Sequence, residues 1–151
     1  MAGAWSPGPH NDGKVFAMKQ TKDALDLERV ALAFVERINL GDVPRLMELM
    51  TEDHEFVDMA GDSFRGLALM RQAWTDYFRL FPDYKIQVET AAINGDSVVL
   101  VGRSDGSLPD DSQGRAIWTA RIQEGRVAQW RVCADTPTVR LCLGLSQAIP
   151  A

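Results

Sequence analysis

Cysteine and histidine are scarce in this chain of 151 residues, which contains two of each. The two cysteines, Cys133 and Cys142, are too few for a disulfide scaffold or for a cysteine-rich zinc site, so we expect reduced thiols. His10 and His54 are too few to build a histidine metal centre. The sequence therefore predicts neither a disulfide framework nor a bound metal ion.

Positive charge is also in deficit, because 16 Lys and Arg residues stand against 21 Asp and Glu residues. Binding to a phosphate backbone requires a basic face, so nucleic acid is not an expected partner. No run of about 18 apolar residues predicts a membrane span. Residues 1–22 lack the continuous apolar core of a signal peptide. We expect a flexible leader over 1–22 and one cytoplasmic domain over 23–151.

The spacing of the apolar residues predicts three helices ahead of most strands. Apolar side chains recur three and four positions apart over 24–40, 43–50 and 67–81. Asp42 is placed to cap the second of these helices, and Pro82 ends the third. The tail after Pro137 is apolar but carries no pattern that assigns its structure.

Strands are predicted where the period changes to two. One lies at 54–58, and four follow the third helix at 84–93, 97–108, 116–123 and 126–136. Asn94-Gly95 and Glu124-Gly125 are typical hairpin turns, since glycine accepts positive φ. This order predicts an α+β domain with a strongly curved, mostly antiparallel sheet.

Four short segments resemble the SnoaL-like group of the nuclear transport factor 2-like superfamily. They are Asn39-Leu40-Gly41-Asp42, Leu49-Met50-Thr51-Glu52-Asp53, Phe64-Arg65-Gly66 and Glu124-Gly125-Arg126-Val127-Ala128-Gln129-Trp130-Arg131. The resemblance extends over 23–136. It implies a cone-shaped α+β barrel in which three N-terminal helices pack on a curved, mostly antiparallel sheet and enclose an apolar pocket. It also implies a homodimer.

Three members of this group suggest three different chemistries. The resemblance to ketosteroid isomerase places Asp58 at the position of that enzyme's base. Its oxyanion-hole donors correspond to Phe34 and Trp118, which do not supply the same groups, so steroid isomerisation is not expected.

The resemblance to limonene epoxide hydrolase places Arg103 and Asp105 at half of an Asp-Arg-Asp set. Alternation along a strand puts these two side chains on one face. The remaining carboxylate corresponds to Val132, and the water-holding Tyr and Asn correspond to Phe56 and Asp58. The set is therefore incomplete. SnoaL-like cyclases need a single carboxylate in an apolar cavity, and Asp58 meets that requirement.

Asp58 is the predicted acid/base residue, because burial among apolar side chains raises the pKa of a carboxyl toward the working range of a base. The alternative is a carboxylate at the rim that caps a turn. Arg103 and Asp105 are expected to orient a substrate oxygen, or else to form a salt bridge on an open sheet surface. His54 is expected either to relay a proton beside Asp58 or to lie in the core.

The predicted pocket lining consists of apolar side chains that otherwise form plain core. These are Phe34, Phe56, Trp74, Phe78, Trp118, Trp130 and Val132. The leading hypothesis is a SnoaL-like enzyme of the cyclase or isomerase type, without cofactor, acting on a small apolar oxygenated molecule. The alternatives are epoxide opening like that of limonene epoxide hydrolase, and a dimeric module that binds a small molecule without catalysis.

Overall fold

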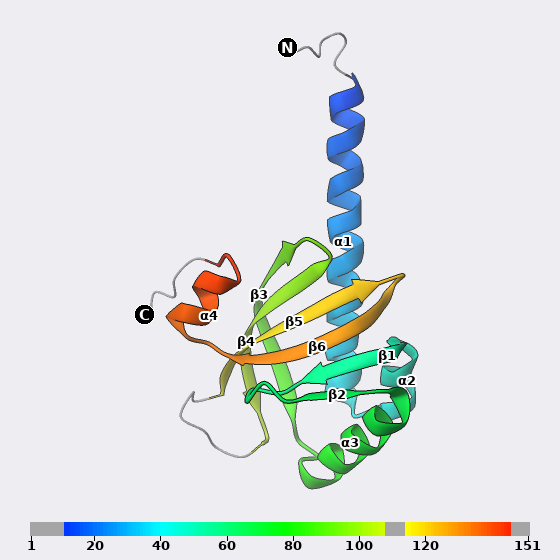
Figure 1. Ribbon diagram of the computed structural model, residues 1–151, viewed down its shortest axis with the longest axis vertical. Coiled ribbons are helices and arrows are strands. Elements are labelled where there is room, and N and C mark those ends of the chain that lie inside the picture. Colours follow the sequence, from blue (N-terminus) through cyan, green and yellow to red (C-terminus); the bar gives the residue numbers. More distant parts are fainter. Residues whose placement is uncertain (1–10, 108–113, 146–151) are drawn as a thin grey trace.

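Figure 1 shows the computed structural model of the chain, which describes residues 11–107 and 114–145, with side chains from Asp23 onward. The helices and strands in chain order are α1 (Asn11–Leu40), α2 (Val43–Glu48), β1 (Met50–Val57), β2 (Ser63–Arg65), α3 (Leu67–Leu80), β3 (Lys85–Asn94), β4 (Ser97–Asp105), β5 (Arg115–Gln123), β6 (Arg126–Ala134) and α4 (Pro137–Cys142). The predicted α+β class, with three leading helices and a curved sheet, is confirmed.

The six strands form one sheet in the order β2-β1-β6-β5-β4-β3. Every neighbouring pair is antiparallel except β1 and β6, which run parallel and bring Phe56 opposite Trp130. The short β2 was not predicted, because it is a three-residue strand that is exposed along its length. The sheet does not close, so the barrel expected from the resemblance is an open, curved sheet (Figure 1).

Helix α1 begins at Asn11, earlier than the apolar spacing predicts. Residues 11–22 were expected to be a flexible leader, but their backbone is helical. They contain no proline, and their three lysines, one alanine and one methionine favour helix. Farther along the helix, Phe34 and Ile38 are fully buried against the sheet. Figure 1 shows the N-terminal part of α1 projecting beyond the sheet.

Local signals position the next two helices. The side chain of Asp42 accepts a hydrogen bond from the backbone N–H of Arg45 at 3.2 Å and caps α2 as predicted. Helix α3 follows Gly66, whose φ of +99° is a conformation that favours glycine. Its buried face contains Met70 and Trp74, which pack toward the sheet.

Apolar side chains cover both faces of the sheet. The inner face carries Trp118 and Trp130 in the main core with α1. The outer face carries a second cluster of Val99, Val101 and Ile117, which is covered by apolar residues of the C-terminal segment that contains α4. None of the helices within the described residues is long and apolar enough to cross a membrane.

Candidate functional site

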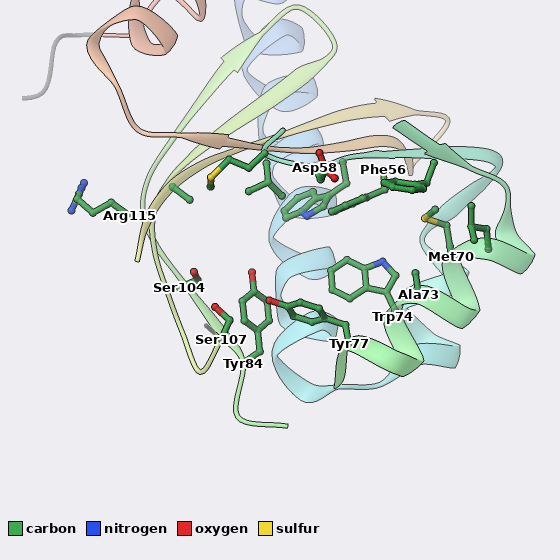
Figure 2. Close-up of a pocket in the computed structure, with 16 residues that line it drawn as sticks. Phe56, Asp58, Met70, Ala73, Trp74, Tyr77, Tyr84, Ser104, Ser107 and Arg115 are labelled. Carbon is green, nitrogen blue, oxygen red and sulfur yellow. The ribbon is translucent and has the colours of Figure 1, made fainter. Parts of the chain in front are cut away.

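A cavity of about 410 Å³ lies between α3 and the inner face of the sheet (Figure 2). Its lining comes from β1, β2, α3, β4, β5, β6 and the turns between them. The described residues that line it are Phe56, Asp58, Met59, Phe64, Leu69, Met70, Ala73, Trp74, Tyr77, Tyr84, Ser104, Ser107, Arg115, Ala116, Trp130 and Val132. Apolar atoms make up most of this lining, as is typical of small-molecule sites.

Aromatic rings form much of the cavity wall. Trp74 on α3 meets Phe56 on β1 nearly at right angles, with ring centroids 6.1 Å apart. Phe56 also contacts Phe64 of β2 at 6.4 Å. Four of the predicted lining residues, Phe56, Trp74, Trp130 and Val132, therefore lie at the cavity.

Asp58 lies where β1 ends and the chain turns toward β2. Its Oδ1 accepts hydrogen bonds from the backbone N–H groups of Ala60 and Asp62, at 3.0 and 2.9 Å. The residue is half-buried and lines the cavity, so it combines the two interpretations that the sequence left open. The turn holds one carboxylate oxygen, while the residue itself borders the apolar space.

Four hydroxyl-bearing residues lie on the other side of the cavity from Asp58, and we call them the hydroxyl cluster: Tyr77, Tyr84, Ser104 and Ser107 (Figure 2). Burial raises the pKa of the Tyr84 phenol well above its ordinary value, against the opposing effect of the Ser104 hydroxyl that faces it. Burial also raises the pKa of Tyr77, which faces Ser107. Both phenols are therefore neutral at physiological pH.

Arg103 and Asp105 lie on the outer face of β4, away from the cavity. Both are exposed, and the Asp105 carboxylate accepts a hydrogen bond from Gln87 at 3.2 Å. Ser104 between them is the residue that faces inward. The structure therefore places this pair outside the cavity, where Arg103 cannot polarise the oxygen of a bound substrate.

His54 is fully buried in the core and does not line the cavity. Its Nδ1 lies 2.6 Å from the Val127 carbonyl oxygen, and since a carbonyl only accepts, Nδ1 carries the hydrogen. Burial lowers the pKa of the imidazole. Phe34 stacks on this ring at 5.8 Å and is itself fully buried. Both residues belong to the core, so the expected proton relay and the lining role of Phe34 are not supported.

Trp118 and Phe78 lie next to the cavity wall without lining it. Trp118 is 1% exposed on the inner face of β5, and its indole N–H lies close to the Tyr84 hydroxyl. Phe78 packs behind Trp74, with ring centroids 5.4 Å apart. They support the wall from behind. Both were predicted to line the cavity because helix and strand periodicity identifies the inner face of an element but not how deeply each residue is buried.

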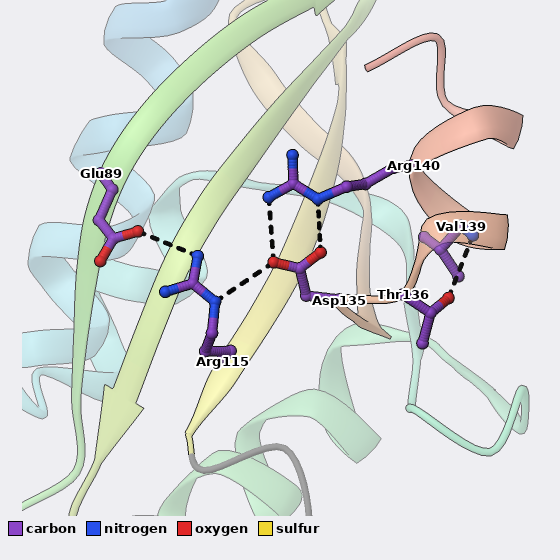
Figure 3. Close-up of polar contacts among 6 residues, drawn as sticks. All are labelled: Glu89, Arg115, Asp135, Thr136, Val139 and Arg140. Atoms are coloured by element: carbon purple, nitrogen blue, oxygen red, sulfur yellow. Dashed lines mark hydrogen bonds and ion pairs between the residues drawn. The ribbon is translucent and has the colours of Figure 1, made fainter. Parts of the chain in front are cut away.

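Arg115 borders the cavity, but its side chain points away from it (Figure 2). Figure 3 shows the guanidinium between the carboxylates of Glu89 and Asp135, with N–O distances of 3.2 and 3.4 Å. Asp135 is held in turn by Arg140 of α4 at 2.6 Å, and the hydrogen bond from Arg140 lowers the pKa of this carboxyl. This network attaches α4 to the sheet and keeps a positive charge outside the cavity.

Sequence reasoning missed the hydroxyl cluster. Tyr77 follows Trp74 by three positions on α3, which is a signal for the same helix face. Ser104 was not predicted, because the charged residues on either side of it, Arg103 and Asp105, were assigned to the site instead. For metal binding, the described residues contain no group of three or more His, Cys, Asp or Glu side chains suitably placed.

Comparison with known proteins places this geometry in a family. The sequence model of the SnoaL-like domain family matches residues 31–130 of this chain. The chain belongs to the SnoaL-like domain family. A search of the curated proteins found no match.

Solved structures share the fold of this SnoaL-like protein at low sequence identity. An LEH-like epoxide hydrolase from M. tuberculosis has a TM-score of 0.64 and 14% identity, over 74% of this chain and 84% of that one. The epoxide hydrolase/cyclase-like enzyme SalBIII, which has a role in pyran ring formation in salinomycin, has a TM-score of 0.61 and 19% identity, over 71% and 88%. An NTF2-like protein from Cytophaga hutchinsonii has a TM-score of 0.58 and 15% identity, over 75% and 93%.

Proposed function

We propose that this SnoaL-like protein is a cofactor-independent enzyme that acts on a small, largely apolar, oxygen-containing molecule by general acid–base chemistry. The observation that supports this most is the cavity of about 410 Å³, whose aromatic wall is bordered by the carboxylate of Asp58. Among its described lining residues, Asp58 is the one acidic side chain. A positioned acid or base of this kind typically contributes about 10²–10⁴-fold to a rate.

The turn after β1 supports a role for Asp58 as the base. Two backbone N–H groups hold Oδ1, which fixes the plane of the carboxylate at the edge of the cavity. Both of these hydrogen bonds go to Oδ1, which leaves Oδ2 for a substrate proton. Fixed orientation matters because proton transfer needs heavy atoms about 2.6–3.2 Å apart.

Cyclisation or isomerisation fits a cavity with Asp58 as the one acidic group among its described lining residues better than epoxide opening does. Both need one positioned acid or base, whereas opening by the Asp-Arg-Asp set needs an arginine at the cavity. Arg103 and Asp105 lie on the other face of the sheet, and the side chain of Arg115 points away.

Binding without turnover is the second candidate. The observation that favours it is the pair of backbone hydrogen bonds to Asp58, since a carboxylate that caps a turn has a structural reason to be there. The same cavity would then serve as a ligand site alone.

Substitution of Asp58 by Asn distinguishes the two candidates, because the amide oxygen can still accept the two turn hydrogen bonds. We would assay the wild type and Asp58→Asn on a panel of enones, epoxides and polyketide analogues, with ¹⁸O-labelled water to detect diol formation. Acid–base catalysis predicts a fall in kcat of about 10² or more with little change in ligand affinity. Asp62→Asn is the matched control, since Asp62 is an exposed acid of the same turn that does not line the cavity. Tight binding with no turnover of any panel member would support the second candidate, a module that binds a ligand without catalysis.

We also propose that the protein works as a homodimer in the cytoplasm. The family resemblance supports the dimer, and the two free thiols, Cys133 and Cys142, are consistent with a reducing compartment. Sedimentation velocity at micromolar concentration tests the dimer, and a single monomeric species would refute it.

A further inference from the structure

A buried donor lies behind the hydroxyl cluster, and the described residues do not fully satisfy it. The indole Nε1–H of Trp118 is inaccessible and has no hydrogen-bond partner of good geometry among the described residues. The polar group that faces it is the hydroxyl of Tyr84, which also faces Ser104. Buried donors are nearly always paired, and the Tyr84 oxygen is the acceptor that this N–H faces.

The direction of donation follows from the chemistry of these groups. An indole N–H donates and cannot accept, so when the Tyr84 oxygen accepts from Trp118, the Tyr84 and Ser104 hydroxyls together keep a hydrogen for an acceptor in the cavity. Tyr84 and Ser104 both line the cavity, so a ligand oxygen can reach this pair. Tyr77 and Ser107 add a second hydroxyl pair beside it.

The charge around the cluster determines which oxygen can bind there. Arg115 is the one cationic side chain among the described lining residues, and its guanidinium is held outside by Glu89 and Asp135. An anionic group placed among neutral hydroxyls inside an apolar wall would be buried without a counter-charge, which is costly. The cluster therefore suits a neutral acceptor.

We propose that the hydroxyl cluster is a specificity site that binds the neutral carbonyl oxygen of the ligand and discriminates against carboxylates. The apolar body of the ligand then lies against Phe56, Trp74 and Trp130. This inference rests on the proposed binding of a small apolar molecule in the cavity, and it narrows that molecule to an uncharged carbonyl compound.

Isothermal titration calorimetry with three matched probes tests this assignment: naphthalene, 2-acetylnaphthalene and 2-naphthoate. In the wild type we expect 2-acetylnaphthalene to bind more tightly than naphthalene and at least about tenfold more tightly than 2-naphthoate, the cost of an unpaired buried charge. Tyr84→Phe removes the hydroxyl and keeps the ring. We expect it to weaken 2-acetylnaphthalene about three- to tenfold and to leave naphthalene within about twofold.

Ser104→Ala is expected to reduce the preference for the carbonyl probe in the same direction. Ser97→Ala is its matched control, because Ser97 begins the same strand and does not line the cavity. Thermal melts of each variant establish that it is folded.

The possible failures are distinct. Equal affinity for the carbonyl and carboxylate probes, or an equal loss for naphthalene and 2-acetylnaphthalene in Tyr84→Phe, would overturn the specificity site while leaving apolar binding intact. Absence of binding by all three probes would overturn the proposed function together with this inference. A loss of turnover in Asp58→Asn with the probe preference unchanged would support both.

Discussion

Tyr77 and Tyr84 meet edge to face, with ring centroids 5.1 Å apart and ring planes at 88°. Tyr77 is on α3, and Tyr84 lies between that helix and β3. The contact therefore joins the helix to the start of the β3–β4 hairpin at the cavity wall. It also places two phenols side by side at the cavity (Figure 2).

The two phenols should resist ionisation. They are the two tyrosines of the chain, so ultraviolet absorbance near 295 nm reports on this pair directly. Burial raises the pKa of both, and each phenol therefore favours the neutral form above the ordinary tyrosine value of 10.0. We expect less than half of the phenolate signal at pH 10, with full ionisation only on alkaline unfolding. A normal titration near pH 10 with circular dichroism unchanged would contradict the buried cluster.

Acid should weaken the fold through His54. Burial holds the pKa of this imidazole below 6.5, so the unfolded chain takes up a proton at a higher pH than the folded chain does. Its contribution to stability is therefore complete above pH 6.5 and falls as pH drops toward the folded-state pKa, by at most about 1.4 kcal/mol per pH unit.

Comparison with His54→Phe isolates this contribution. Urea unfolding between pH 5 and 7.5 should show a steeper loss of stability in the wild type than in the variant, even if the variant is less stable throughout because the Val127 carbonyl loses its donor. Parallel pH profiles for the two proteins would show that His54 is not the group responsible.

Asp135 should contribute more to stability than an exposed ion pair does. Its carboxylate is 4% exposed and lies between Arg115 and Arg140, so Asp135→Asn removes the partner of two cations. We expect a loss of about 2 kcal/mol or more in urea unfolding, together with loosening of α4. Since Arg140 lowers the pKa of this carboxyl below 3.8, its stabilisation is present above that pH and is lost as pH falls.

The control for this prediction is Asp76→Asn. Asp76 pairs with Arg79 one helical turn away on α3, and both side chains are largely exposed. An exposed pair of this type is worth about 0–1 kcal/mol. Equal losses for the two variants would mean that the Asp135 network does not anchor α4.

Gly102 should tolerate no side chain. A Cβ atom there would overlap the backbone carbonyl of Gln87 on β3, and neither strand can move without disturbing the hairpin. Gly102→Ala should destabilise the protein by about 1–3 kcal/mol in urea unfolding. Gly95→Asn at the turn of the same hairpin has open space and a φ of +66°, which asparagine accepts, so it should cost less. If Gly102→Ala leaves the free energy of unfolding unchanged, β3 and β4 are less closely packed than the structure shows.

The element order was predictable because its signals are local. Apolar spacing identifies the inner face of α1 and α3, and Gly95 and Gly125 identify the hairpins from their turns. The parallel pairing of β1 with β6 was not predictable, since it depends on contacts between segments that are far apart in the sequence. Helix α4 was missed for the same reason, because it is stabilised by the sheet surface beneath it.

The site was only partly predictable for a related reason. Phe56 near the end of β1 and Asp58 just after it are two positions apart, and the face that alternation assigns to them is the one at the cavity. On β4 both faces are apolar, because Leu100 faces the inner core while Val101 lies under the C-terminal segment. Alternation alone then cannot tell which face borders the cavity, and the charged pair of Arg103 and Asp105 was assigned to the wrong one.

The place of β6 between β1 and β5 has a consequence for biosynthesis. Strands β1 and β2 leave the ribosome well before β6, and a two-stranded ribbon is marginally stable by itself. Trp130 and Val132 on β6 complete the cavity wall, so the cavity of a nascent chain is incomplete until that strand has emerged. In this interval the free edge of β1 and the unburied rings of α3 make the nascent chain prone to aggregate.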